Sequence, residues 1–206
     1  MAKQTNILEQ IRNMSKKQAF YLIVVLAACV GALVYVQTEK YLVDLDYLSF
    51  YTSEVRRSGA SLVLATPEKT VRTGQTFSVD ILLDTNREKI DGVDLYSLKY
   101  DPQLLDVQDS DLTQSGTQIS SAGLMPIVVV NRVNEREGTI QFAQVTEGGT
   151  TYNGKGKIAT VTFKALKSGS AVLSFDFVPG KTTDTNIASD GVDRLKNAAS
   201  LNIAIR

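Results

Sequence analysis

The sequence of 206 residues predicts an all-β sandwich of nine strands, preceded by one transmembrane helix and a helical stalk. Three observations support this fold class. Short apolar–polar runs separated by turn residues follow one another from Ser61 to the C-terminus. No segment between these runs has the periodicity of a crossover helix, so the strands should pair mainly antiparallel. The one long apolar stretch, near the N-terminus, has the length of a membrane span.

The predicted membrane span is an uncharged stretch of 18 residues from Ala19 to Val36. A bilayer core requires about 20 apolar residues, with a range of roughly 17–25. The charged residues before it are mostly basic: Lys3, Arg12, Lys16 and Lys17, with Glu9 as the acidic exception. The positive-inside rule therefore predicts that residues 1–18 are cytoplasmic and that residues 19–36 cross the membrane once. Everything after residue 36 is then extracytoplasmic, at the cell surface.

Three other interpretations of this stretch stay open. A cleaved signal peptide would usually have a shorter apolar core. Leu26-Ala27-Ala28-Cys29 resembles a bacterial lipobox, in which Cys29 would become the lipid-modified N-terminus, although the chain stays apolar through Val36. A buried core helix is the third interpretation, and no second apolar helix is predicted for it to pack against.

Residues 37–60 are predicted to form a helical stalk or linker. They contain no proline, and the apolar residues recur at spacings of three and four: Tyr41, Leu45, Leu48, Tyr51 and Val55. Such a stripe is compatible with a plain spacer or with a seam that joins copies of the chain into a homo-oligomer. The stripe is shorter than the three to four heptads that define a coiled coil.

Composition excludes several classes of function. The 22 basic and 22 acidic residues balance, which argues against a nucleic-acid partner. The chain has no histidine, the commonest general base and metal ligand. Its one cysteine, Cys29, cannot form a disulfide within the chain. The stability of the outer domain must therefore come from its apolar core.

The outer domain is predicted over residues 61–206. Its nine predicted strands are Ser61–Ala65, Thr76–Leu83, Gly92–Tyr100, Leu104–Val107, Met125–Val133, Thr139–Thr146, Lys157–Ala165, Ala171–Phe177 and Ser200–Ile205. In the third strand the apolar phase slips by one residue, because Val93 and Leu95 are followed by Leu98. An extra residue at Tyr96-Ser97, a β-bulge, would restore the register.

Four motifs in this domain resemble those of cohesin domains. They are GVDLYSLKYDPQLLDV over 92–107, the G-x-x-F-x-V pattern at 74–79, the G-x-I-x-F pattern at 138–142 and GKIATVTFKA over 156–165. The resemblance covers nearly all of residues 61–206. It implies a nine-stranded jelly-roll sandwich, related in architecture to carbohydrate-binding modules. It also implies a protein-binding role, because cohesins capture dockerin modules through one sheet face. The chain departs from cellulosomal scaffolds in having a single module.

The leading hypothesis is therefore a non-catalytic surface module that captures a protein, dockerin-like or from the envelope. The residues expected to bind it are those on the outward side of strand 92–100 and its neighbour: Asp94, Tyr96, Lys99 and Gln141. Tyrosine is favoured at recognition surfaces because it buries a large area at low entropic cost. The alternatives are polysaccharide binding, with Tyr96 and Tyr152 as outward rings, and a structural role in an envelope or appendage assembly.

The sequence offers little for catalysis or cofactors. No pair of carboxylates can be placed at the separation that a glycosidase needs, and no other enzyme motif is present. One oxygen-rich segment, with Asp184, Asn186 and Asp190, is a weak Ca²⁺ candidate. Asx-turns explain the same composition without a metal, and we favour that interpretation. The chain is predicted to need no cofactor and not to be an enzyme.

Overall fold

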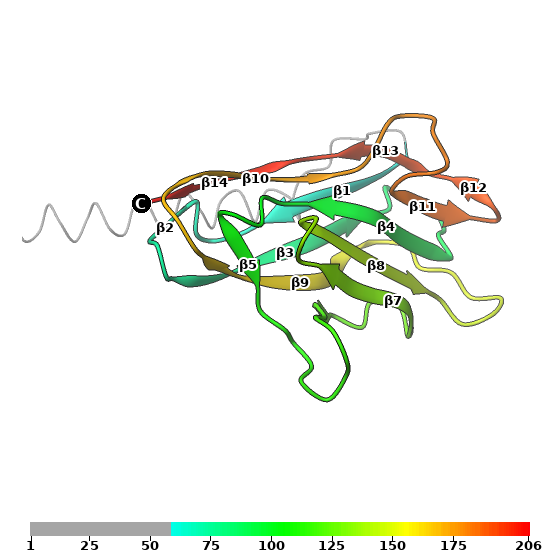
Figure 1. The fold of residues 1–206 in the computed structure, drawn as a ribbon. Coiled ribbons are helices and arrows are strands. Elements are labelled where there is room, and N and C mark those ends of the chain that lie inside the picture. The colour runs from blue at the N-terminus through cyan, green and yellow to red at the C-terminus, as the bar shows by residue number, and fades with distance from the viewer. Residues whose placement is uncertain (1–58) are drawn as a thin grey trace, which may run out of the picture. The chain divides into compact units, whose positions relative to one another are not determined.

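The computed structural model describes residues 59–206, which form two β-sheets packed on each other (Figure 1). The predicted segments 1–18, 19–36 with Cys29, and 37–58 lie outside the described residues. Within residues 59–206, no helix has the length and apolar character that a membrane crossing requires. Ala60, the last residue of the predicted stalk, is the first residue of strand β1.

The first sheet has six strands. Its order is β13-β1-β3-β9-β5, and β6 also pairs with β9. The strands are β1 (Ala60–Ala65), β3 (Thr76–Asp84), β5 (Leu105–Val107), β6 (Ser120–Ser121), β9 (Lys155–Ala165) and β13 (Leu195–Ala198).

The second sheet has eight strands. Its order is β12-β11-β4-β10-β14-β2, and β8 joins β4 to the terminal strand β7. The strands are β2 (Thr70–Val71), β4 (Gly92–Lys99), β7 (Ile127–Asn134), β8 (Thr139–Val145), β10 (Gly169–Phe175), β11 (Asn186–Ser189), β12 (Val192–Asp193) and β14 (Leu201–Ile205). Among the described strand pairs, only β1–β13 and β14–β2 are parallel. The prediction that the strands pair mainly antiparallel is therefore confirmed.

The core lies between the two sheets and follows the alternation of the strands. On β9, the apolar residues Ile158, Val161 and Phe163 are buried, while Thr160 and Thr162 are more exposed. Phe163 stacks on Phe77 with ring centroids 5.8 Å apart and meets the edge of Tyr100 at 5.5 Å. Such aromatic pairs add to the stability that burial of their area gives.

Each of the nine predicted strands overlaps a strand of the structure. Five further strands of two to four residues were not predicted: β2, β6, β11, β12 and β13. They are too short to show an alternating pattern, and tertiary pairing alone defines them.

Two long excursions interrupt the sheets. Strands β5 and β6 pair with the same edge of β9, and residues 108–119 leave the sheet between them; we call this segment the edge loop. Strands β10 and β11 likewise share one edge of β4, and residues 176–185 leave between them. The Thr185 N–H closes this second excursion by donating to the Asp176 carbonyl at 2.8 Å.

Candidate functional site

The outward faces of the two sheets differ in chemistry. Across β3 and β9 the outward side chains are polar and bond to one another. Asp80 lies 3.3 Å from Lys157 and accepts a hydrogen bond of 2.7 Å from Thr160. The eight-stranded sheet, in contrast, presents mixed apolar and polar side chains around β4 and β8. This second face is the better candidate for binding a macromolecule, because protein interfaces combine apolar and aromatic contacts with hydrogen bonds.

Strand β4 presents its polar residues outward because its apolar residues enter the core. Val93, Leu95 and Leu98 are buried, whereas Asp94, Tyr96 and Lys99 are exposed. Leu95 pairs with Phe142 and Leu98 pairs with Ile140, so two residues of β4 lie opposite Gln141 alone. The predicted bulge at Tyr96-Ser97 is therefore confirmed. It returns Leu98 to the core and keeps Lys99 on the outward side.

The register of the sheet arranges the outward residues in four rows that cross the strands. Residues directly opposite on paired strands share a face. From one end of β4 to the other, the rows are Ile127, Val145, Gly92 and Ala188; Val130, Ala143, Asp94 and Asn186; Arg132, Gln141 and Tyr96; and Asn134, Thr139, Lys99 and Ser174. We call this surface the β4–β8 face. It is apolar at one end and polar at the other.

Hydrogen bonds hold the polar half of the face in place. The Gln141 amide donates to the Tyr96 carbonyl at 3.0 Å and accepts from Arg132 Nε at 2.6 Å. Lys99 Nζ lies 3.1 Å from Asp176 Oδ1, so part of its charge is neutralised. The Tyr96 ring stays 49% exposed above this network. An exposed aromatic ring on a fixed backbone is a typical anchor for a protein partner.

Asp94 lies in the second row, between Ala143 on one side and Asn186 on the other. The loss of hydration there raises the pKa of its carboxyl above the ordinary value. A carboxylate that has lost part of its water gains more than a fully solvated one when a partner supplies a hydrogen-bond donor. Asp94 is thus placed to make a directional contact beside the apolar row.

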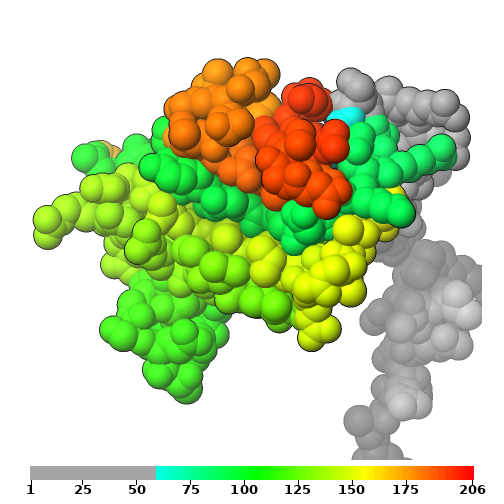
Figure 2. All heavy atoms as spheres, turned by 90° about the vertical axis from the view of Figure 1, so that its right-hand side faces the viewer, coloured from blue at the N-terminus to red at the C-terminus, as the bar shows by residue number. Residues whose placement is uncertain are grey.

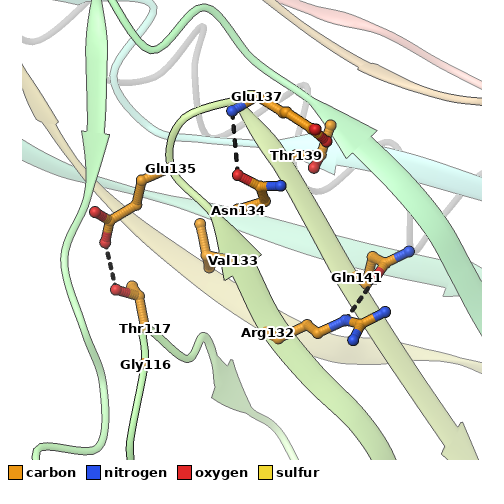
Figure 3. Close-up of a pocket in the computed structure, with 9 residues that line it drawn as sticks. All are labelled: Gly116, Thr117, Arg132, Val133, Asn134, Glu135, Glu137, Thr139 and Gln141. Carbon is orange, nitrogen blue, oxygen red and sulfur yellow. Dashed lines mark hydrogen bonds between the residues drawn. The ribbon is translucent and has the colours of Figure 1, made fainter.

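A hollow of about 770 Å³ opens where β7 and β8 meet, at the polar end of the face (Figure 3). Four of its lining residues belong to the third and fourth rows: Arg132, Asn134, Thr139 and Gln141. Glu135 and Glu137 line it from the β7–β8 turn, and Thr117 donates a hydrogen bond to Glu135. A protruding side chain of a partner can enter here without displacing the strands.

The structure brings all four predicted residues, Asp94, Tyr96, Lys99 and Gln141, onto one face. Sequence reasoning missed the apolar row and Arg132. The predicted strand 125–133 contains several of these residues. Its bulge between Val128 and Val130 interrupts the alternation, so the sequence does not indicate which residues point outward. Their neighbours across the sheet follow only from the register.

The weak Ca²⁺ candidates have structural roles in the described chain. Asp184 is buried, and its Oδ2 accepts a 2.6 Å hydrogen bond from the Val178 N–H. Asn186 donates to the Asp184 carbonyl at 3.0 Å. Asp190 has a φ of 50° in the β11–β12 turn. Among residues 59–206, no group of three or more His, Cys, Asp or Glu residues is placed to hold a metal ion.

The two stacked sheets and the mixed outward face define a β-sandwich module of the kind built for binding. The family model described as "Cohesin domain" matches residues 61–202, and the chain therefore belongs to the cohesin family. This confirms the resemblance seen in the four sequence motifs.

Solved structures agree on the fold. A type II cohesin domain from the cellulosome of Acetivibrio cellulolyticus is 21% identical, with a TM-score of 0.54 over 71% of this chain and 94% of that chain. A chain of a type I cohesin–dockerin complex from Clostridium thermocellum is 15% identical, with a TM-score of 0.54 over 72% and 99%. The cohesin module of a Clostridium perfringens family 33 glycoside hydrolase is 14% identical, with a TM-score of 0.54 over 73% and 98%. No curated protein matches the sequence.

Proposed function

We propose that this protein is a non-catalytic module that captures a protein partner on the β4–β8 face, outside the cell. The observation that carries the proposal is the composition of this face: an apolar row, one exposed tyrosine and a partly desolvated carboxylate, Asp94, lie on a continuous sheet. Membership of the cohesin family supports a protein as the ligand. The uncharged stretch 19–36 would hold the module at the membrane.

A dockerin-like module is the partner class that we propose. Two of the similar solved structures are described as cohesins in complex with dockerins. A dockerin contains duplicated Ca²⁺ loops, and its fold depends on the metal, as metal-linked folds do. The described cohesin residues contain no carboxylate cluster of this kind. Calcium dependence of the complex would therefore originate in the partner.

The test is capture of dockerin modules by the full chain in mild detergent, measured by biolayer interferometry. We expect Ca²⁺-dependent capture of at least one type I or type II dockerin. Removing Ca²⁺ should abolish capture and leave the circular dichroism of the cohesin unchanged. Tyr96→Ala should weaken capture about 30-fold, the effect of losing a central aromatic contact. The matched control is Lys164→Ala, at an exposed position of the six-stranded sheet. Equal capture by both variants would refute the β4–β8 face as the site.

Polysaccharide binding has less support on this surface. Sugar sites on β-sandwiches present aromatic rings for stacking, and Tyr96 is the one aromatic residue in the four rows. Tyr152, the second ring expected to face outward, packs partly buried against the core, and its hydroxyl donates to the Lys155 carbonyl at 2.9 Å. We therefore expect no binding on a glycan array.

A structural role through the stalk would require an oligomer, and a monomer in detergent would argue against it.

A further inference from the structure

A groove of about 520 Å³ lies on the edge of the sandwich, away from the outward face of β8. Residues 117–119 of the edge loop first run along the free edge of β7. The Val133 N–H donates to the Thr117 carbonyl at 3.0 Å, and the Asn131 amide makes bonds of 2.9 and 2.7 Å with the Ile119 backbone. The chain then leaves β7, and Ser120–Ser121 pairs with β9 as β6. The groove opens where these two segments diverge.

One wall of the groove is apolar. Val128 and Val129 line it, and Val129 is the extra residue of the β7 bulge, with 60% of its surface exposed. Exposed valines at a strand edge are normally avoided because they invite contact with another chain. Here they face a hollow of defined shape. Their exposure indicates a surface that a ligand covers.

The opposite wall is polar and lacks a positive charge. The groove is lined by Ser110, Asp111, Gln114, Gln118, Ile119, Ser120, Ser121, Val128, Val129 and Asn131. Asp111 is the one charged residue among them. It accepts hydrogen bonds from Thr113 and Gln114, and these bonds lower the pKa of its carboxyl below the ordinary value. The charge of the lining therefore favours a cation.

Gln118 provides an independent indication of a ligand. Its side chain is only 6% exposed, and its Nε2 donates to the Ser115 carbonyl at 3.0 Å. Its Oε1 is buried and has no hydrogen-bond partner. A buried acceptor left without a donor costs about 1–3 kcal/mol. A donor that enters the groove would remove this cost.

The edge loop is built to hold these groups in place. The Asp109 carboxylate accepts hydrogen bonds from the backbone N–H groups of Asp111 and Gln118, and the Ser110 N–H donates to the Gln118 carbonyl. The loop extends away from the body of the domain (Figure 2, bright green at the bottom). A loop ordered in this way presents its acceptors before a ligand arrives.

We propose that this groove binds an extended peptide segment bearing lysine or arginine, supplied by the same protein that the β4–β8 face captures. The aliphatic stem of the basic side chain packs on Val128 and Val129, and its head group donates to Asp111 and Gln118. The groove follows β7 from Val128 to Asn131, roughly 13 Å of extended chain. The origin of the segment rests on the proposed function, whereas the chemistry of the groove does not.

Continuity of the surface is the reason to assign the segment to the captured partner. Strand β7 presents Ile127 and Val130 to the β4–β8 face and Val128 and Val129 to the groove. A partner on the face therefore needs only a short extension to reach around the edge of β7. A sugar is a poorer occupant, because the groove lining includes no aromatic ring on which a pyranose could stack.

The experiment measures fluorescence polarisation of a labelled, capped peptide that alternates valine and lysine, with the full chain in mild detergent. A peptide with glutamine in place of lysine is the matched probe. We expect the lysine peptide to bind about fivefold more tightly, the upper end of the range for one exposed ion pair, with the difference shrinking as salt is raised. Asp111→Asn should remove most of this preference.

Two further variants locate the site. Val129→Lys places a positive charge in the groove and should abolish binding of the lysine peptide. Its control is Val192→Lys, at a 50% exposed valine on β12, at the far end of the same sheet, and it should bind normally. Equal affinity for both peptides, or normal binding by Val129→Lys, would overturn the proposal. If dockerin capture fails while the lysine peptide binds, the proposed function is wrong and the chemistry of the groove stands.

Discussion

Tyr100 shows how one residue links the core to the candidate site. It follows β4, its ring meets the edge of Phe163, and it is almost fully buried. Burial, assisted by the negative charges of Glu135 and Asp106, raises the pKa of its hydroxyl from 10.0 to about 12. Glu135 also lines the hollow of Figure 3, so the protonated tyrosine lies close to the polar end of the β4–β8 face.

This raised pKa predicts a loss of stability in alkali. Between pH 10 and about 12 the unfolded chain releases the Tyr100 proton while the folded chain retains it, so the free energy of unfolding falls as the pH rises through this window. The loss is on the order of 2 kcal/mol. Urea unfolding of the wild type and of Tyr100→Phe at pH 9 to 12 should show a steeper decline for the wild type. Parallel declines would contradict the shift.

At the scale of the strand, the sequence predicts those features that depend on the local pattern of apolar and polar residues. The bulge in β4 could be inferred because the alternation of apolar residues shifts by one position between Leu95 and Leu98, and one extra residue restores it. The apolar row of the β4–β8 face and the place of Arg132 could not, because which strands lie side by side is decided by long-range pairing. The groove was equally inaccessible to sequence reasoning: the edge loop has no periodicity, and its contact with β7 joins Thr117 to Val133.

Gly138 joins β7 to β8 and allows a close approach to β4. It has a φ of 65°, and a Cβ placed there would lie 2.2 Å from the Tyr100 carbonyl oxygen. Gly138→Ala should therefore be strongly destabilising, well beyond the roughly 1–2 kcal/mol that an alanine pays for left-handed backbone. Gly123→Ala is the matched control, because Gly123 has a φ of 69° and open space around it.

Thermal unfolding of the two glycine variants separates these effects. Gly123→Ala should report only the backbone cost, and Gly138→Ala should lose clearly more, since backbone atoms cannot move aside as a flexible side chain can. A similar loss in both variants would mean that the turn relaxes away from β4. In that case dockerin capture by Gly138→Ala should also fall, because the fourth row of the face ends at this turn.

At the scale of the whole molecule, both proposed contacts meet at one strand. The β4–β8 face uses the outward residues of β7, and the groove uses its bulge and free edge. The six-stranded sheet contributes Ser120 and Ser121 of β6 to the groove, whereas the outward polar groups of β3 and β9 bond to one another. Binding is thereby concentrated on the eight-stranded sheet and its β7 edge, and the central strands of the other sheet serve to complete the core.

The topology of the chain yields the last prediction. Residues 1–18 should be cytoplasmic, residues 19–36 should cross the membrane once, and the β-sandwich should be outside. Each basic residue before the span resists translocation, whereas apolar residues at the centre of the span each favour the bilayer by about 0.3–0.6 kcal/mol. Changing Lys16 and Lys17 to Glu should therefore weaken the orientation without preventing insertion.

Protease added to intact cells or spheroplasts measures this directly. It should remove the β-sandwich and leave a small membrane-bound fragment that contains the N-terminus, because the predicted orientation exposes the domain and shields the basic segment. Protection of the β-sandwich until the membrane is opened would reverse the orientation. Mass spectrometry of the mature N-terminus distinguishes the lipoprotein alternative: a chain beginning at a lipid-modified Cys29 would have no cytoplasmic segment, and protease would leave only a short lipidated peptide in the membrane.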